Sequence, residues 1–267
     1  MNSIKKNIHN TYVKEYLANN KRSDGRKLTD FRDTAINLKP ITISDGSSVV
    51  KIGNTSVICG VRLELGTPKP ETPNTGYLLV NVELPSLCYK KFRPGIPCDE
   101  AMETTSFLNE ICNNCNLVDL KQLCICIDKL VWVISFDIYC LNYDGSIVDT
   151  CLTALLSSIN TIKIPEVKYD KETEEINVIT NYKALHVNSM PVASTFAIFS
   201  EKYIVADPTE EEEQLCLSKI TIVTNGSRLY SLHKPGGDFI KDNQIQYCLV
   251  RAKRRALEMH KILLDAE

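Results

Sequence analysis

The chain has 267 residues, of which 43% are hydrophobic and 24% are charged, and its formal net charge at pH 7 is -2. This composition is typical of a globular protein and excludes a chain that is disordered throughout. The nearly balanced charge excludes a uniformly basic surface, so any surface that binds nucleic acid has to be local.

The first part of the chain contains an N-terminal arm and then several strands. Residues 1–20 are rich in lysine and asparagine, and we expect a short helix or a loose arm there. Three strands separated by Asp-Gly and Gly-Asn turns are predicted next, at residues 41–44, 48–52 and 56–64.

The middle part alternates between loops and regular elements. Residues 66–76 contain three prolines and two glycines, which is typical of a loop without a strand of its own. A strand is predicted over 77–83, a second loop over 85–99, and a helix with one apolar face over about 100–112.

The remaining part begins with the strongest strand signal of the chain, at residues 130–140, where apolar side chains recur at every second position. Ser146 and Asp149 match a capping-box pattern at the start of a buried helix over 147–159. Four strands and a last helix follow, at 195–199, 202–206, 218–224, 228–232 and 242–264.

This order of elements predicts an α+β protein. Two halves, of about 25–125 and 126–267, each place strands before a helix, which suggests a duplicated unit within one domain over 21–267. No stretch approaches the roughly 18 apolar residues of a membrane helix, and the N-terminus lacks the apolar run of a signal peptide. We therefore expect an intracellular protein without a membrane segment.

The eleven cysteines are odd in number and lie mostly in apolar runs, which indicates reduced, buried thiols. We expect neither a metal nor another cofactor. The alternative is a zinc-binding interaction module, whose ligands would be Cys112, Cys115, Cys124 and Cys126.

Five segments in a fixed order and spacing carry a family resemblance: 22–26 with 31–32, 47–61, 73–76 with 80–85, 143–145, and 207–212. Together they resemble the RNase PH family, specifically the ring subunits of the RNA exosome, over residues 20–260. Phe92–Gly95 and His233–Gly237 look most like a eukaryotic ring subunit.

The resemblance implies an RNase PH-like fold of two βαβα-type halves, assembled into a hexameric ring with a central channel, and RNA as the substrate class. It implies other RNase PH-like ring subunits, RNA-binding cap subunits, RNA and associated exosome nucleases as partners. The implied locations are the nucleus, the nucleolus and the cytoplasm.

Active members of that family cleave RNA from its 3′ end with inorganic phosphate, which requires arginines and a helix N-terminus around the phosphate and a carboxylate nearby. The family's phosphate-binding turn corresponds to Ile147 and Val148, whose side chains cannot bind phosphate. Ser106 stands near the expected place of a second arginine, and no arginine lies between residues 94 and 227.

The resemblance places the two catalytic carboxylates near Glu213 and near Lys219, and a lysine has the wrong charge for that role. We therefore expect a non-catalytic ring subunit that supports 3′-to-5′ processing and degradation of RNA, including rRNA processing and mRNA decay. The alternative is an active phosphate-dependent 3′-to-5′ exoribonuclease that uses a displaced set of arginines.

The resemblance directs the loops after Gly60 and Leu84 toward the channel entrance. These loops carry five basic residues that we predict to bind RNA: Arg62, Lys69, Lys90, Lys91 and Arg93. A solvated loop without RNA contact is the competing interpretation.

Other charged groups are expected to be structural or solvated. Arg22 and Arg26 should pair with carboxylates or backbone carbonyls, with Gly25 in a turn. Glu210–Glu213 is interpreted as a solvated acidic loop rather than a magnesium site, and Arg251–Arg255 as a solvated helix face that has RNA or partner contact as its alternative. His186, His233 and His260 have no Ser or Cys at a catalytic spacing.

Overall fold

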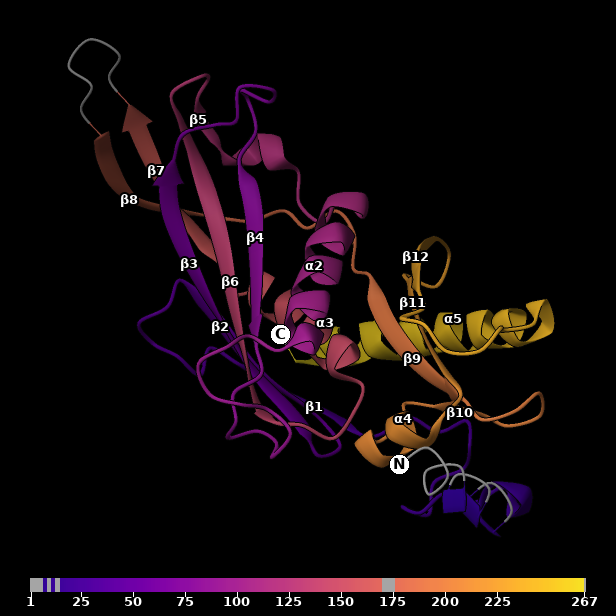
Figure 1. The fold of residues 1–267 in the computed structure, drawn as a ribbon. Helices are drawn as coiled ribbons and strands as arrows, with labels where there is room; N and C mark the ends of the chain where they lie inside the picture. The colour runs from indigo at the N-terminus through magenta and orange to yellow at the C-terminus, as the bar shows by residue number, and fades with distance from the viewer. Residues whose placement is uncertain (1–6, 9–10, 13–14, 170–175, 267) are drawn as a thin grey trace.

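The computed structural model describes residues 7–8, 11–12, 15–169 and 176–266, which form two sheets with helices between and beside them (Figure 1). The first sheet has the strand order β1 (Thr34–Leu38), β2 (Gly46–Ile52), β3 (Thr55–Gly66), β6 (Leu130–Asn142) and β4 (Tyr77–Glu83), and β5 (Cys124–Cys126) also pairs with β6. The β4–β6 pair is parallel, whereas the other pairs of this sheet are antiparallel.

The second sheet is antiparallel and has the order β10 (Ile204–Ala206), β9 (Val192–Ile198), β11 (Ser218–Thr224) and β12 (Leu229–His233). A hairpin of β7 (Lys163–Tyr169) and β8 (Ile176–Ala184) follows the first sheet and precedes the second along the chain. The sequence analysis did not predict this hairpin.

Four α-helices complete the described fold: α2 (Asp99–Asn114), α3 (Ile147–Ile159), α4 (Glu210–Leu215) and α5 (Asp242–Asp265). Short 3-10 turns lie at η1 (Leu17–Asn19) and η2 (Leu120–Leu123). The predicted α+β class is confirmed, as are the helices expected at 100–112, 147–159 and 242–264 and the long strand at 130–140.

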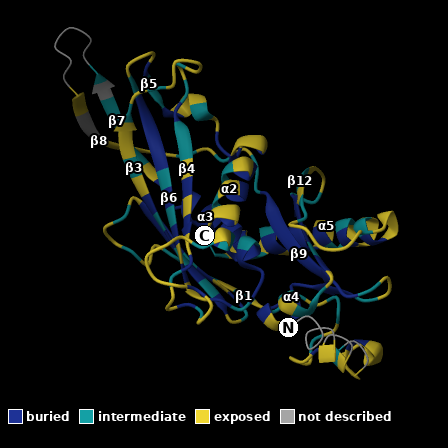
Figure 2. Cartoon of the chain, viewed as in Figure 1, coloured by how far each residue is buried: buried dark blue, intermediate teal, exposed yellow. Residues whose placement is uncertain are grey.

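Helix α3 lies between the sheets, packed against β2 and β3 on one side and β9 on the other. All of its residues except Val148 are buried, as the dark colour of the central helix shows in Figure 2. A helix covered on both sides has to be apolar around its circumference. Its few hydroxyls are satisfied internally; for example, Thr153 and Ser157 donate to the carbonyls four residues earlier.

Residues 41–44 are not a strand, which corrects the prediction for that segment. They belong to the connection between β1 and β2, where Leu38 pairs with Ser48, and Ile43 is 96% exposed. The first strand of this hairpin is instead Thr34–Leu38. The isoleucines at 41 and 43 produced the strand signal although the chain there turns back on itself.

The predicted capping box at the start of α3 is wrong. Ser146 has φ of +49° and its hydroxyl donates to the carbonyl of Pro208, while the carboxylate of Asp149 accepts hydrogen bonds from Thr195. Gly145 before it has φ of +76°, and a Cβ there would stand 2.4 Å from the Pro208 carbonyl oxygen. This close approach brings the segment after β10 against the start of α3.

Glu210–Glu213 is not a solvated loop, which corrects a second prediction. These residues form most of α4, which follows Thr209 as N-cap residue, and Glu212 is completely buried. Acidic side chains in a first helical turn are favoured by the positive end of the helix dipole.

Strand β6 pairs with both β3 and β4, so a division of the chain at residues 125 and 126 passes through the first sheet. Within the predicted N-terminal arm, residues 1–6, 9–10 and 13–14 lie outside the described residues, whereas Leu17 is buried in a cluster with Phe199 and Val205. None of the helices that the structure describes is long and apolar enough to cross a membrane.

Candidate functional site

A cavity of about 480 Å³ opens between the start of α2, Tyr143, α4, the start of β11 and the loop at 235–237. Two lysines, Lys91 and Lys219, line it together with five carboxylates: Asp99, Glu100, Glu103, Glu210 and Glu213. This is the region where the sequence resemblance places a phosphate site. An excess of negative charge opposes the binding of an anion such as phosphate.

The carboxylate of Glu213 lies at the N-terminus of α3, the position that favours an anion at a helix start. The backbone N–H of Ser146 donates to Glu213 Oε1 at 2.8 Å. The ammonium of Lys219 donates to Glu213 Oε2 at 2.9 Å. A side chain of the protein itself therefore occupies this position.

The Glu213–Lys219 pair is largely shielded from solvent, with side-chain exposures of 10% and 28%. Burial by itself lowers the pKa of Lys219, but the neighbouring charge of Glu213 and their hydrogen bond outweigh it, so the net pKa is raised. Lys219 stays protonated and paired. A protonated lysine cannot act as a general base.

Tyr143 and Glu100 form a second hydrogen-bonded pair in the cavity. The Tyr143 hydroxyl donates to Glu100 Oε1, and Lys91 Nζ donates to Glu100 Oε2 at 3.1 Å. Burial, followed by the negative charges of Glu213 and Glu100, raises the pKa of Tyr143 above its ordinary value. The phenol therefore remains a neutral hydrogen-bond donor.

Three residues stand where the resemblance implies phosphate ligands: Ser106, Ile147 and Val148. Ile147 is 3% exposed and belongs to the main hydrophobic core, and Val148 packs against that core. Ser106 lies exposed on α2.

The arginines near the N-terminus are structural, as predicted. Arg22 is 2% exposed; it pairs with Glu212 and donates to the carbonyls of Ala206 and Asp207. Arg32 binds Asp207 through two nitrogens, at 2.8 and 2.7 Å. Buried Arg–carboxylate forks of this kind hold residues 22–32 against β10 and α4.

Arg26 completes this cluster by pairing with Asp24 at 2.6 Å and with Asp207 at 3.2 Å. Burial by itself raises the pKa of Asp207, but the hydrogen bonds and charge of Arg32 outweigh it and hold the pKa below its usual range. Because all three arginines of this cluster pair with carboxylates of the protein, the cluster does not offer a surface for RNA.

Lys69 lies apart from the other predicted RNA-binding residues. It follows β3, whose last residue Gly66 is opposite Val131 of β6, whereas Lys90, Lys91 and Arg93 follow β4, whose last residue Glu83 is opposite Tyr139, a separation of eight residues or about 26 Å. Arg62 lies between these ends, opposite Ser135.

The partners of these five residues also differ. Arg62 pairs with Asp137 at 3.0 Å and with Glu64 at 3.6 Å, and Lys91 pairs with Glu100. Lys69 lies over the ring of Tyr77, with its nitrogen 5.6 Å from the centroid. Lys90 and Arg93 are exposed.

The cysteine pattern gains no support as a metal site. Cys112 and Cys115 are buried at the end of α2, and burial raises the pKa of both thiols to about 12, which opposes the thiolate form that binds zinc. In the part of the chain that is described, no three His, Cys, Asp or Glu side chains are grouped to hold a metal ion. All eleven cysteines are free.

Two of the histidines have partners other than Ser or Cys. His233 Nε2 lies 2.9 Å from Glu103 Oε1, and His260 Nε2 lies 2.8 Å from the Met190 carbonyl oxygen.

Sequence reasoning missed that Glu213 reaches Ser146, because this contact joins residues that are 67 positions apart. Gly145 was the available signal, since a glycine at a helix start is compatible with close approach of another segment. It also missed Asp149, a completely buried acid that faces Thr195 rather than capping α3.

Comparison with known proteins gives a consistent result. The model of the 3′ exoribonuclease family, domain 1, matches residues 30–165, and that of domain 2 matches residues 189–255. The chain is 34% identical over 254 residues to the exosome complex component rrp43 of Schizosaccharomyces pombe, covering 94% of each. It is 32% identical to the exosome complex component Rrp42 of Pyrococcus furiosus, covering 97% of this chain and 94% of the relative.

Solved structures agree. The Archaeoglobus fulgidus exosome with RNA bound to the active site contains a chain that superposes with a TM-score of 0.84 at 28% identity, covering 96% of this chain and 97% of that one. Rice Rrp46, at 17% identity and a TM-score of 0.68, shares the fold. With both family domains matched in order and relatives aligned over nearly their full lengths, the chain belongs to the 3′ exoribonuclease (RNase PH) family.

Proposed function

We propose that this chain is a non-catalytic subunit of the exosome core ring, which supports 3′-to-5′ processing and degradation of RNA, including rRNA processing and mRNA decay. The observation that carries the proposal is Lys219, a lysine at the place where the resemblance expects a catalytic carboxylate, whose ammonium donates to Glu213 Oε2 at 2.9 Å. In the resemblance, inorganic phosphate would bind at the start of α3, where Ile147 and Val148 supply apolar side chains and the Ser146 N–H already donates to Glu213.

The active enzyme is the alternative, and the charges of the cavity argue against it. Phosphorolysis brings a phosphate anion beside an anionic diester, which requires a strongly positive site. Here five carboxylates face two lysines, and both lysines pair with carboxylates.

A phosphorolysis assay tests the absence of catalysis. A ring reconstituted with this chain is incubated with end-labelled single-stranded RNA and inorganic phosphate, and released nucleoside diphosphate is measured. We expect replacement of Glu213 and Lys219 together by alanine to leave the release unchanged. A loss of phosphate-dependent release on changing only this chain would identify it as the active subunit.

The proposed partners are other RNase PH-like ring subunits, RNA-binding cap subunits, RNA and the associated nucleases, in nucleus, nucleolus and cytoplasm. Exposed apolar side chains support assembly: Ile43, Leu87 and Phe239 are 96%, 88% and 102% exposed. Each of these side chains would lose contact with water if a neighbouring subunit covered it, which favours association. Native mass spectrometry after co-expression should show this chain with other ring subunits, and a stable monomer that ignores them would contradict the proposal.

We also propose a division of the chain between residues 165 and 189 rather than at 125. The two family matches separate there, and β6 on the N-terminal side is integral to the first sheet.

Five basic residues remain the proposed RNA contacts, because all of them are exposed: Arg62, Lys69, Lys90, Lys91 and Arg93. The ion pairs of Arg62 and Lys91 are exposed pairs, which exchange readily for a better geometry.

A further inference from the structure

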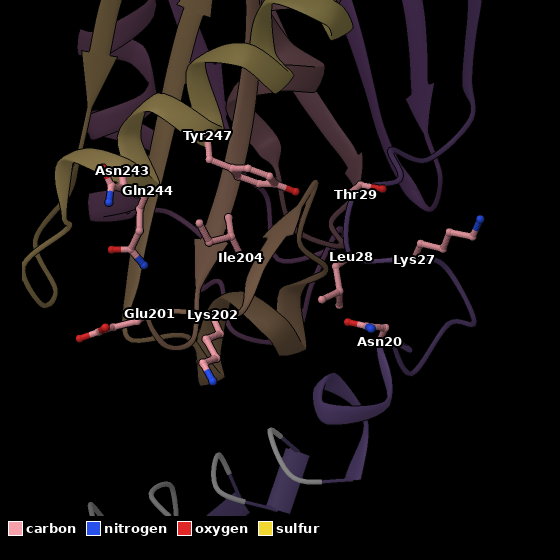
Figure 3. A pocket seen from close by; sticks show the side chains of 10 residues that line it. All are labelled: Asn20, Lys27, Leu28, Thr29, Glu201, Lys202, Ile204, Asn243, Gln244 and Tyr247. Atoms are coloured by element: carbon pink, nitrogen blue, oxygen red, sulfur yellow. The ribbon is translucent and has the colours of Figure 1, made fainter.

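A groove runs along one flank of α5, between this helix and residues 27–31. It consists of two cavities, of about 610 and 350 Å³, which share Thr29 as a lining residue. Figure 3 shows the larger one, where Tyr247 extends from α5 across the groove and Leu28 and Ile204 lie beside it. These three side chains make this end of the groove largely apolar.

The other end of the groove is lined by three arginines of α5, Arg251, Arg254 and Arg255, with Phe31 beside them. Arg255 is 9% exposed; it donates to Thr34 Oγ1 at 2.9 Å and lies 4.8 Å from the centroid of Phe31. The nearest oxygen of Glu258 is 3.8 Å from Arg255 Nη1. The carboxylates of Asp207, Asp149 and Asp33 also act on the charge of this guanidinium, so capacity for a further carboxylate lies with the other two arginines.

Arg251 is available to pair with a carboxylate of a partner. Its guanidinium lies over the Tyr247 ring at 5.5 Å, and it forms no ion pair with any residue that the structure describes. Arg254 has a pair with Glu258, at 3.4 Å, in which both side chains are about half or more exposed. Such exposed pairs are weak and exchange readily for a better geometry.

The surface beside the arginines is apolar. Val250, Leu257 and Leu264 recur every seven residues along α5 and are 69%, 59% and 62% exposed. Exposed aliphatic side chains next to Tyr and Arg are typical of protein interfaces. An RNA backbone gains nothing from these aliphatic side chains, whereas apolar side chains of a protein partner lose contact with water against them.

We propose that this groove binds a segment of a neighbouring protein subunit in which an apolar side chain is accompanied by acidic residues. The apolar side chain enters the end lined by Leu28, Ile204 and Tyr247, and the carboxylates pair with Arg251 and Arg254. The inference rests on the proposed function, because the neighbour is taken to be another subunit of the exosome assembly.

The test uses the full-length chain and an otherwise complete set of ring and cap subunits. Arg251→Glu is compared with Lys121→Glu, which makes the same charge change at an exposed lysine of η2, away from α5 and the groove. We expect Arg251→Glu to weaken incorporation into the assembly at least about tenfold, as for a central charged contact of an interface. Lys121→Glu should incorporate like the wild type.

Thermal unfolding of both variants controls for folding, and Arg251→Gln provides a milder change if the charge reversal does not fold. A photoreactive residue at Val250 should cross-link to a neighbouring subunit at an acidic segment. Replacing an acid of that segment by arginine should restore incorporation of Arg251→Glu.

Three results would overturn the proposal, and they differ in what else they overturn. Normal incorporation of both Arg251 variants removes the groove from the interface and leaves the proposed function intact. A loss of affinity for labelled single-stranded RNA with normal incorporation reassigns the arginines to RNA. If the wild-type chain itself does not join the other subunits, the proposed function fails as well.

Discussion

Glu213 has two interactions that a bound anion would otherwise make: it accepts from the Ser146 N–H at the start of α3 and from Lys219. Glu211, two residues before Glu213 on α4, is exposed and makes neither contact. Replacing either glutamate removes the same charge from α4, but only replacement of Glu213 also vacates the start of α3. Comparing the two replacements therefore separates the effect of local charge from the effect of the contact with the helix start.

Replacing Glu213 by alanine should therefore lower the free energy of unfolding by about 1–3 kcal/mol, because Lys219 and the Ser146 N–H lose their partner. The same change should create a vacant site for an anion, so that inorganic phosphate raises the melting temperature of the variant but not of the wild type. Glu211→Ala is the matched control. A phosphate response equal in Glu213→Ala and in wild type would contradict the interpretation.

Asp149 is a buried acid whose pKa burial raises to about 7, although hydrogen bonds from Thr195 oppose the shift. A folded-state pKa above the unfolded value of 3.8 means that the folded protein binds the proton more tightly. Its contribution to stability is therefore complete below about pH 4 and is lost as pH rises toward 7.

Asp149→Asn removes this titration and keeps an acceptor for the Thr195 N–H. We expect the free energy of unfolding of the variant, relative to wild type, to increase between pH 5 and pH 8 by on the order of a few kcal/mol. Denaturation curves across this range measure it, and the exposed Asp265→Asn is the control. A difference that stays constant with pH would show that Asp149 does not titrate there.

At the scale of elements, α2 protects an edge of the first sheet. Strand β4 is the last strand on that side, and Asn109 of α2 bonds both polar groups of Val80: its Oδ1 accepts from the N–H at 3.0 Å and its Nδ2 donates to the carbonyl at 2.8 Å. Thr105 accepts from the Val82 N–H at 3.0 Å. Side chains of a covering helix thus replace the strand that an open edge would attract.

Asn109→Ala should lower the free energy of unfolding by about 1–3 kcal/mol, because it leaves two part-buried backbone groups without their partner. It should also increase aggregation on heating, since the β4 edge becomes available for pairing. Chemical denaturation and light scattering report the two effects. Ser106→Ala, on an exposed position of the same helix, should change neither.

At the scale of the whole molecule, the net charge of -2 conceals an uneven distribution. Carboxylates surround the cavity at α2 and α4, arginines line the groove beside α5, and exposed basic residues follow β4. Lys69, beyond the far end of β3, is separate from them. Any contact with RNA therefore depends on which end of the first sheet faces it.

Replacing Lys90, Lys91 and Arg93 by alanine in an assembled ring should reduce the salt dependence of RNA binding, by about 0.7 log units per log unit of salt for each phosphate that is no longer neutralised. Base preference should not change, because interactions with phosphates carry no sequence information. Lys69→Ala, beyond the opposite end of β3, is the comparison. An unchanged slope in the triple variant would remove the loop after β4 from the RNA path.

The sequence by itself determined the class of the fold, its longest elements and its family. Alternation over β6, the apolar run of α3 and the stripe of α5 are signals within a single segment, and the family motifs are local strings. The same locality explains the expected roles of Ile147 and Val148, whose apolar side chains exclude phosphate binding wherever they lie.

Only the tertiary structure decided how distant charges are paired. Glu213 meets Ser146, Arg22 meets Glu212 and Arg32 meets Asp207 across 67 to 190 positions of sequence, because the segment after β10 packs onto the start of α3 and onto the N-terminal segment. The periodicity of apolar residues indicates which residues share a face of one helix or strand. It does not indicate which charged residues of different elements pair. Whether a charged run is solvated, as expected for Glu210–Glu213, or buried, as observed for Glu212, therefore depends on the packing of the whole chain.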